Sequence, residues 1–180
     1  MNAMVENTHI MSAVGSDEAA ATSGLTAPSS HVEQIGSRMN RQWRVLLVDD
    51  DPVARTLLRV LVEEHGELQV VGEASDGEEA IVLAERYRPD VILMDIHLPR
   101  VSGVEATRHI NKMLPQSMII GVSSLYTPHN YNAMLAAGAV AFVRKEDAVE
   151  ALYKTVEFAM HAYRPNRRPS GPMTAPIETN

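Results

Sequence analysis

The stretch VILMDIHLP, residues 91–99, decides the fold. Four apolar residues run into Asp95, and a loop that contains Pro99 follows. A short apolar run that ends at turn signals is typical of a strand buried on both faces of a parallel sheet. In open α/β sheets, ligands bind outside the carboxyl ends of such strands. Asp95 is therefore the first candidate for a functional carboxylate.

Three further apolar runs end in polar residues in the same way. They cover residues 45–48, 118–122 and 139–143, and the residues that follow them are Asp49, Asp50 and Asp51, then Ser123 and Ser124, then Arg144 and Lys145. Segments with helical spacing alternate with these runs, which predicts βα repeats and a parallel sheet. Right-handed crossovers bring the carboxyl ends of parallel strands to one edge. We expect the polar strand-end residues to converge there.

The pattern predicts five strands and five helices. The first helix begins with Asp51 as its N-cap and Pro52 at its first position, and Gly66 stops it. Residues 70–71 form a short second strand. Ser75 or Asp76 caps the second helix, which ends at Tyr87. The third helix is expected over 104–113, the fourth over 130–137, and the last from its cap at Asp147 to about Tyr163.

Composition excludes several classes of function. The chain has 180 residues, a formal net charge of −7 and no cysteine. Disulfides, thiol catalysis and cysteine-based zinc sites are excluded, and the acidic balance weighs against direct contact with nucleic acid. No apolar stretch reaches the ~18 residues of a membrane span, and the N-terminus lacks the features of a signal peptide. We therefore expect a cytoplasmic location and no membrane partner.

The folded domain is expected over residues 43–163. Residues 1–42 are rich in Ala, Ser, Thr, Gly and Asn and read as a disordered extension. Residues 164–180 read as a disordered tail that contains proline and arginine. Met39 lies just before the first strand. Either it is the start of the protein, or the extension is translated, and both interpretations stay open.

The predicted cluster of carboxylates points to phosphoryl chemistry. Carboxylates that share a pocket hold protons more tightly unless a cation is present, and Mg²⁺ prefers oxygen ligands of this kind. A carboxylate can act as a nucleophile and form an aspartyl-phosphate. Phosphoryl transfer depends on positioning and on neutralising the phosphoryl oxygens, for which Mg²⁺, Lys145 and Ser123 are suited. The residues thus predict a Mg²⁺-assisted site with aspartate as the acceptor.

Residues 44–160 resemble the receiver domain of response regulators in two-component signalling. The resemblance rests on the motifs VDD (48–50), LMDIHLP (93–99) with Gly103, GVSS (121–124), AGA (137–139) and VRK (143–145). Residues 70–80 resemble the subfamily that is usually fused to a helix-turn-helix output domain. The resemblance implies a flavodoxin-like α/β fold, a doubly wound parallel sheet of five strands in the order 2-1-3-4-5 with five helices.

The resemblance also implies a role for each motif residue. Asp95 would be the phosphoacceptor, and Asp49, Asp50, Asp95 and the backbone carbonyl of His97 would bind Mg²⁺. Ser123 would be the switch hydroxyl, Lys145 the lysine that contacts the phosphoryl group, and Phe142 the switch aromatic. The sequence departs from the family at Glu146, where many members have a cis-proline.

The expected function is that of a stand-alone receiver, a phosphoacceptor signalling protein rather than an enzyme. A sensor histidine kinase or a histidine phosphotransfer protein would donate the phosphoryl group to Asp95. The surface of the fourth helix, fifth strand and fifth helix would then select an output protein or a second copy of the chain. Only about 17 residues follow the last predicted helix, too few for a DNA-binding unit.

Three alternative functions compete with this expectation. A phosphorylation-independent adaptor is disfavoured by the full set of acidic, hydroxyl and lysine residues. A transcriptional regulator whose DNA-binding domain was lost or lies on another chain is the second alternative. A phosphatase of the haloacid dehalogenase type needs a second acid two residues after its nucleophile, and His97 occupies that position.

Overall fold

A computed structural model describes residues 42–162 and contains five strands and five α-helices in that range. Each strand is followed by a helix, as the alternating pattern predicts. The strands are β1 Trp43–Val48, β2 Leu68–Ala74, β3 Val91–Asp95, β4 Met118–Ser123 and β5 Ala141–Arg144. The helices are α2 Pro52–Glu63, α3 Gly77–Tyr87, α4 Gly103–Met113, α5 Pro128–Ala137 and α6 Ala148–Ala162, with a 3₁₀ turn, η1, over Lys145–Asp147.

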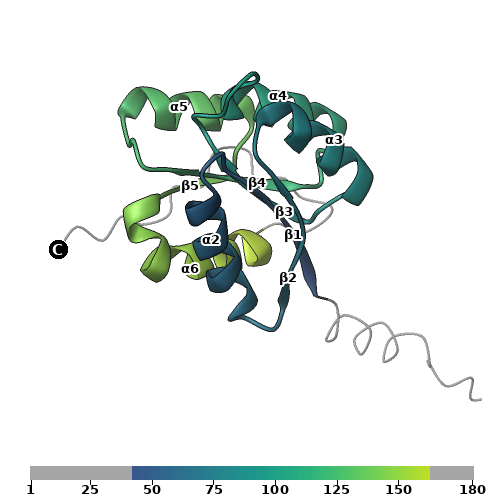
Figure 1. The fold of residues 1–180 in the computed structure, drawn as a ribbon, viewed down its shortest axis with the longest axis vertical. Coiled ribbons are helices and arrows are strands. Elements are labelled where there is room, and N and C mark those ends of the chain that lie inside the picture. Colours follow the sequence, from purple (N-terminus) through teal and green to yellow (C-terminus); the bar gives the residue numbers. More distant parts are fainter. Residues whose placement is uncertain (1–41, 163–180) are drawn as a thin grey trace, which may run out of the picture.

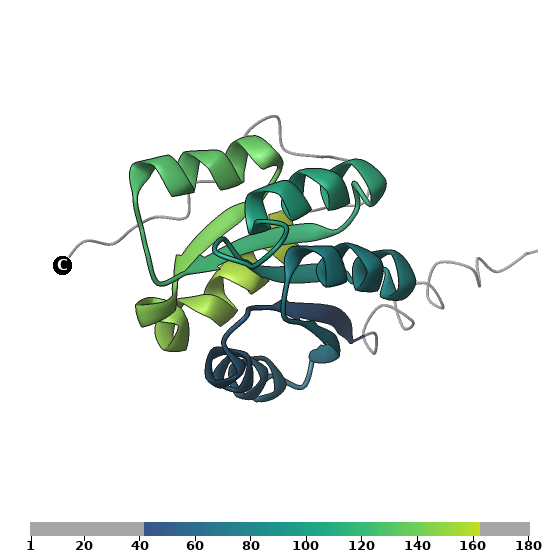
Figure 2. The ribbon, with the colours of Figure 1, turned by 45° about the horizontal axis from the view of Figure 1, so that its top comes forward.

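The five strands form one parallel sheet in the order β2-β1-β3-β4-β5. Helices α3, α4 and α5 cover one face, and α2 and α6 cover the other (Figures 1 and 2). From β1 the chain first adds β2 on one side and then crosses to the other side, where β3, β4 and β5 follow in order. This topology is the doubly wound, flavodoxin-like fold that was predicted.

The sheet separates two apolar cores because successive strand residues point to opposite faces. In β1, Val45 and Leu47 pack with residues of α2 and α6. Leu46 and Val48 pack on the other face with residues of α3 and α4. All five residues of β3 are buried. The central strands therefore hold their ends, and the loops after them, on a rigid support.

Side-chain caps fix the helix beginnings at that edge. The Asp51 carboxylate accepts from the Val53 N–H at 2.8 Å, which confirms the predicted cap of α2. Of the two candidates for α3, Asp76 is the cap, and it accepts from the N–H groups of Glu78 and Glu79. Ser102 caps α4 with a capping box that the sequence reading missed.

Several predicted boundaries need correction. Helix α2 ends at Glu63, before Gly66, and its C-cap Glu64 keeps right-handed backbone geometry. Strand β2 is longer than residues 70–71, and α5 begins at Pro128, with Thr127 as its cap. The start of the last helix agrees with the prediction, because Asp147 directly precedes α6; it lies in η1, where its carboxylate accepts from Arg144 Nε at 2.5 Å.

The described range leaves some predictions outside it. The proposed extension, the tail and the alternative start at Met39 fall on residues that the structure does not describe. Within residues 42–162, no helix has the combination of length and apolarity that a membrane crossing requires.

Candidate functional site

The predicted site residues come from four neighbouring strands at one edge of the sheet. Asp49 and Asp50 follow β1, Asp95 ends β3, and Ser123 ends β4. Lys145 directly follows β5. In the parallel register Asp95 pairs with Val122, and Ser123 pairs with Arg144. The sheet thus brings together residues that lie almost one hundred positions apart in the sequence.

Three carboxylates form the centre of this edge. Oxygen atoms of Asp49, Asp50 and Asp95 all lie within 4.8 Å of one another. Asp49 and Asp95 are buried, while Asp50 is exposed. Two buried carboxylates and an exposed one leave the cluster open to solvent on the Asp50 side. The arrangement is an acidic pocket with one solvent-exposed member.

Lys145 places one positive charge between the two buried carboxylates. Its Nζ lies 2.6 Å from Asp49 Oδ2 and 2.9 Å from Asp95 Oδ2. Burial alone would lower the pKa of Lys145, but the contacts with Asp49 and Asp95 outweigh burial and raise it. The ammonium therefore stays charged at neutral pH.

The Asp49 carboxylate shows that one ammonium does not satisfy the pocket. Its Oδ1 accepts from the Asp51 N–H at 3.0 Å, and its buried Oδ2 contacts the Lys145 ammonium at 2.6 Å. Burial raises the pKa of Asp49. Three carboxylates share this single ammonium, and such an excess of negative charge fits a divalent cation with oxygen ligands.

The loop after β3 is fixed to Asp95 itself. Asp95 Oδ1 accepts from the N–H of Ile96 at 2.6 Å and of His97 at 3.4 Å. The Gly103 N–H donates to the Ile96 carbonyl at 2.9 Å. A Cβ atom at Gly103 would collide with the Asp95 carbonyl oxygen. Only glycine lets the start of α4 approach this closely.

Ser123 and Phe142 lie on the side of β4 and β5. Ser123 is fully buried, and its Oγ accepts from the Leu125 N–H at 3.3 Å. The Phe142 ring lies edge-on to Tyr126 and Tyr131, with centroids 5.8 and 5.9 Å away. Phe142 is thus partly buried in an aromatic cluster that joins β5, α5 and the loop between β4 and α5.

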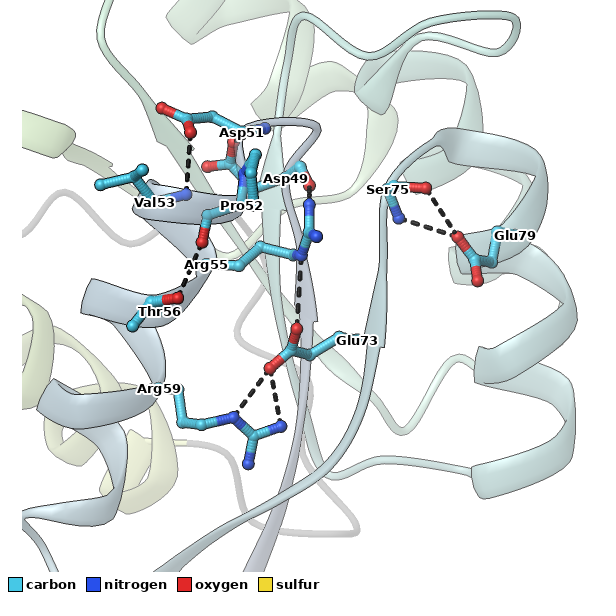
Figure 3. Close-up of polar contacts among 10 residues, drawn as sticks. All are labelled: Asp49, Asp51, Pro52, Val53, Arg55, Thr56, Arg59, Glu73, Ser75 and Glu79. Carbon is cyan, nitrogen blue, oxygen red and sulfur yellow. Dashed lines mark hydrogen bonds and ion pairs between the residues drawn. The ribbon is translucent and has the colours of Figure 1, made fainter.

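Sequence reasoning missed the polar network that holds the acidic loop from the side of α2. Figure 3 shows Arg55 between Asp49 and Glu73, with Arg59 on the other side of Glu73. The available signal was the position of Arg55, four residues after the cap Asp51 and hence one helical turn along α2. A second missed contact is the ion pair of Arg100 with the buried Asp76.

Known proteins share this organisation. The family model of the response regulator receiver domain matches residues 45–157. The transcriptional regulatory protein YxjL of Bacillus subtilis is 37% identical over 64% of this chain. A protein-glutamate methylesterase/protein-glutamine glutaminase of Hahella chejuensis is 42% identical over 62% of it. The chain spans only 53% and 35% of the length of these two relatives.

Solved structures agree with the fold. The response regulator domain of Thermotoga maritima CheB covers 69% of this chain and all of its own, with a TM-score of 0.64 and 32% identity. A LuxR-family response regulator from Aurantimonas covers 68% of this chain and 88% of its own, with a TM-score of 0.65 and 32% identity. With the family model matched over most of the described residues, the chain belongs to the response regulators of two-component systems and carries their receiver domain.

Proposed function

We propose that this receiver accepts a phosphoryl group on Asp95 from a histidine kinase or a histidine phosphotransfer protein. The observation that carries the proposal is the position of Lys145, between Asp49 and Asp95 in a pocket of three carboxylates. A phosphoryl group on Asp95 would meet an ammonium that already contacts the acceptor oxygen. Positioning and charge neutralisation are what phosphoryl transfer requires.

The pocket is proposed to take Mg²⁺ as its cofactor. The carboxylates of Asp49, Asp50 and Asp95 and the backbone carbonyl of His97 would hold it. When bound, Mg²⁺ would neutralise charge on the phosphoryl oxygens. Asp50 is the exposed member of the pocket, which leaves the approach to Asp95 open on that side.

In the proposed transfer, an oxygen of the Asp95 carboxylate forms a bond to phosphorus while the bond from phosphorus to the donor histidine nitrogen breaks. The imidazole of the donor keeps the electron pair of that bond. Lys145 stays protonated and contacts a phosphoryl oxygen, and the Ser123 hydroxyl donates to another. No net oxidation or reduction occurs. Apart from its own phosphorylation and slow hydrolysis of the product, the chain is proposed to catalyse no reaction.

Ser123, Phe142 and Lys145 are proposed to convert phosphorylation into a change of surface. The phosphoryl group adds a charge of about −1.5 to −2 and attracts the Ser123 hydroxyl and the Lys145 ammonium. Because the Leu125 N–H is bound to Ser123 Oγ, the loop before α5 follows the hydroxyl. Tyr126 belongs to that loop and packs against Phe142, so movement of the loop repacks the aromatic cluster.

The output is proposed to leave through protein contact on the face formed by α5, β5 and α6, with a downstream protein or a second copy as the partner. The relatives are a transcriptional regulator and a methylesterase, so they share the receiver and differ in output. We propose no direct binding of nucleic acid by the receiver, and a cytoplasmic location follows from the proposed phosphodonors. The similarity to YxjL favours, as the second candidate, a role as the receiver of a DNA-binding regulator.

The proposal is tested by intact-protein mass spectrometry after incubation with Mg²⁺ and acetyl phosphate. We expect the wild type to gain the mass of one phosphoryl group, and the gain to disappear when Mg²⁺ is removed by a chelator. No gain in the wild type, together with no Mg²⁺ binding, would refute the proposal and favour a phosphorylation-independent adaptor. A gel-shift assay with and without phosphorylation tests the second candidate.

A further inference from the structure

Arg55 makes the contact that ties α2 to the acidic loop. Its Nη1 donates to the backbone carbonyl of Asp49 at 2.6 Å, and its Nε contacts Glu73 Oε2 at 3.3 Å (Figure 3). Only 18% of the Arg55 side chain is exposed. The guanidinium thus lies between the end of β1 and the edge strand β2, directly below the loop that carries Asp49 and Asp50.

The Asp49 carbonyl is a sensitive place for such a contact. It belongs to the peptide unit that joins Asp49 to Asp50, so its direction is coupled to the backbone torsions of both residues. The Asp49 N–H already donates to the Ala74 carbonyl at 3.1 Å, and Asp49 Oδ1 accepts from the Asp51 N–H. With the N–H and the side chain held, the bond from Arg55 fixes the remaining polar group of Asp49.

Arg59 provides an internal comparison. It also pairs with Glu73, at 2.7 Å from Nη2 to Oε1, and it pairs with Glu63 at 2.7 Å. The interactions described for Arg59 go to these glutamates and not to Asp49. The two arginines lie one turn apart on α2, share one carboxylate, and differ in the contact with the acidic pair.

We propose that Arg55 is a positioning residue that orients Asp49 and Asp50 for the divalent cation, and that Glu73 in turn orients Arg55. The inference rests on the proposed function of the acidic pocket. The bond from Arg55 ends on a backbone carbonyl of the acidic loop and not on a second carboxylate, so its geometric effect falls on the acidic pair itself. Residues that orient metal ligands change metal affinity when they are replaced, typically by about 10–100-fold.

The test compares Arg55→Met with Arg59→Met. Both variants keep a long apolar stem and lose the pair with Glu73, but only Arg55→Met loses the bond to Asp49. Mg²⁺ binding is measured by calorimetry without a phosphodonor, and the Mg²⁺ concentration for half-maximal labelling by acetyl phosphate is measured separately. For Arg55→Met we expect the dissociation constant for Mg²⁺ and the Mg²⁺ concentration for half-maximal labelling each to rise about 10-fold. Labelling should still be complete at saturating Mg²⁺. Arg59→Met should match the wild type.

Rescue and fold controls make the result specific. Arg55→Lys keeps a donor near the Asp49 carbonyl and should give an Mg²⁺ affinity between those of the wild type and Arg55→Met. Thermal unfolding of the Mg²⁺-free proteins should give Arg55→Met and Arg59→Met similar Tm values.

Unchanged Mg²⁺ affinity in Arg55→Met, or an equal loss in both methionine variants, would overturn the positioning role. If Arg55→Met is poorly folded, Arg55→Lys decides: an Mg²⁺ affinity below that of the wild type supports the role, and a wild-type affinity overturns it. A wild type that binds Mg²⁺ but accepts no phosphoryl group would refute the proposed function instead, and the calorimetric comparison would still test Arg55.

Discussion

The interior of β3 and its end differ in chemistry although they lie one residue apart. Residues 91–94 are fully buried apolar side chains, and Asp95 is buried almost as deeply. Each apolar residue gains about 25 cal/mol per Å² of apolar surface removed from water. The Asp95 carboxylate loses hydration instead, and Lys145 and two backbone N–H groups offset that loss.

We therefore expect the interior of β3 to determine stability and its end to determine function. The strand interior should tolerate changes in polarity poorly, and changes there should affect folding. Removing the charge of Asp95 at the strand end should leave the fold intact, because the loss of one of several close carboxylates relieves repulsion. The same loss should abolish function.

The largest expected effect is the loss of labelling in Asp95→Asn. The amide is not a nucleophile for phosphoryl transfer, so acetyl phosphate and Mg²⁺ should add no phosphoryl group, while circular dichroism should show an intact fold. Asp90→Asn is the matched control, because Asp90 lies just before the opposite end of β3, where its side chain accepts from the Arg44 N–H. It should label like the wild type. Normal labelling of Asp95→Asn would show that the end of β3 does not carry the phosphoacceptor.

The next effect is a loss of stability in Leu93→Ala. Leu93 is fully buried in the centre of the sheet, and truncation there should lower the free energy of unfolding by about 2–5 kcal/mol. Urea unfolding measures this loss. The folded fraction should still be labelled on Asp95. A stable Leu93→Ala variant that cannot be labelled would show that interior and end are not separable.

A smaller effect is expected for Gly103→Ala, because Gly103 lies at the start of α4 against the end of β3. The added Cβ would meet the Asp95 carbonyl, so the start of α4 must move away from β3. We expect a loss of about 1–3 kcal/mol, typical of overpacking, together with slower labelling. Gly66→Ala is the control, since a Cβ there meets no atom within 4 Å. If urea unfolding gave Gly103→Ala and Gly66→Ala the same free energy of unfolding, the close approach of α4 to the Asp95 carbonyl would be contradicted.

The smallest effect is the pH dependence contributed by Lys145. Its pKa is raised above the ordinary value of 10.5 in the folded chain, because the contacts with Asp49 and Asp95 outweigh burial. The stabilisation from this shift is fully present below pH 10.5 and is lost as the pH rises through the raised pKa. The difference in unfolding free energy between wild type and Lys145→Met should therefore shrink at strongly alkaline pH. A constant difference across that range would argue against the ion pairs.

Sequence alone predicts the strand ends well for a physical reason. The central strands are covered on both faces, so they read as apolar runs whose final polar residue stands out. Asp49, Asp95 and Ser123 follow this rule at the ends of β1, β3 and β4. Strand β2 does not, because it lies at the sheet edge and includes half-buried Glu73, and its predicted length was too short.

The contacts that the sequence did not reveal are long-range polar ones. Arg55 lies on α2 and Glu73 on β2, eighteen residues away, and no local pattern links the two residues. Their meeting depends on how α2 packs across β1 and β2, which local pattern does not determine. Asp147, the predicted cap of the last helix, directly precedes α6, and its carboxylate accepts from Arg144, three residues earlier.

The most direct test of the account is to locate the phosphoryl group on the chain. After labelling with acetyl phosphate and Mg²⁺, hydroxylamine converts an acyl phosphate into a hydroxamate, and peptide mass spectrometry identifies the modified residue. We expect modification at Asp95 and nowhere else. Modification at Asp49 or Asp50, or a phosphoryl group that resists hydroxylamine, would contradict it.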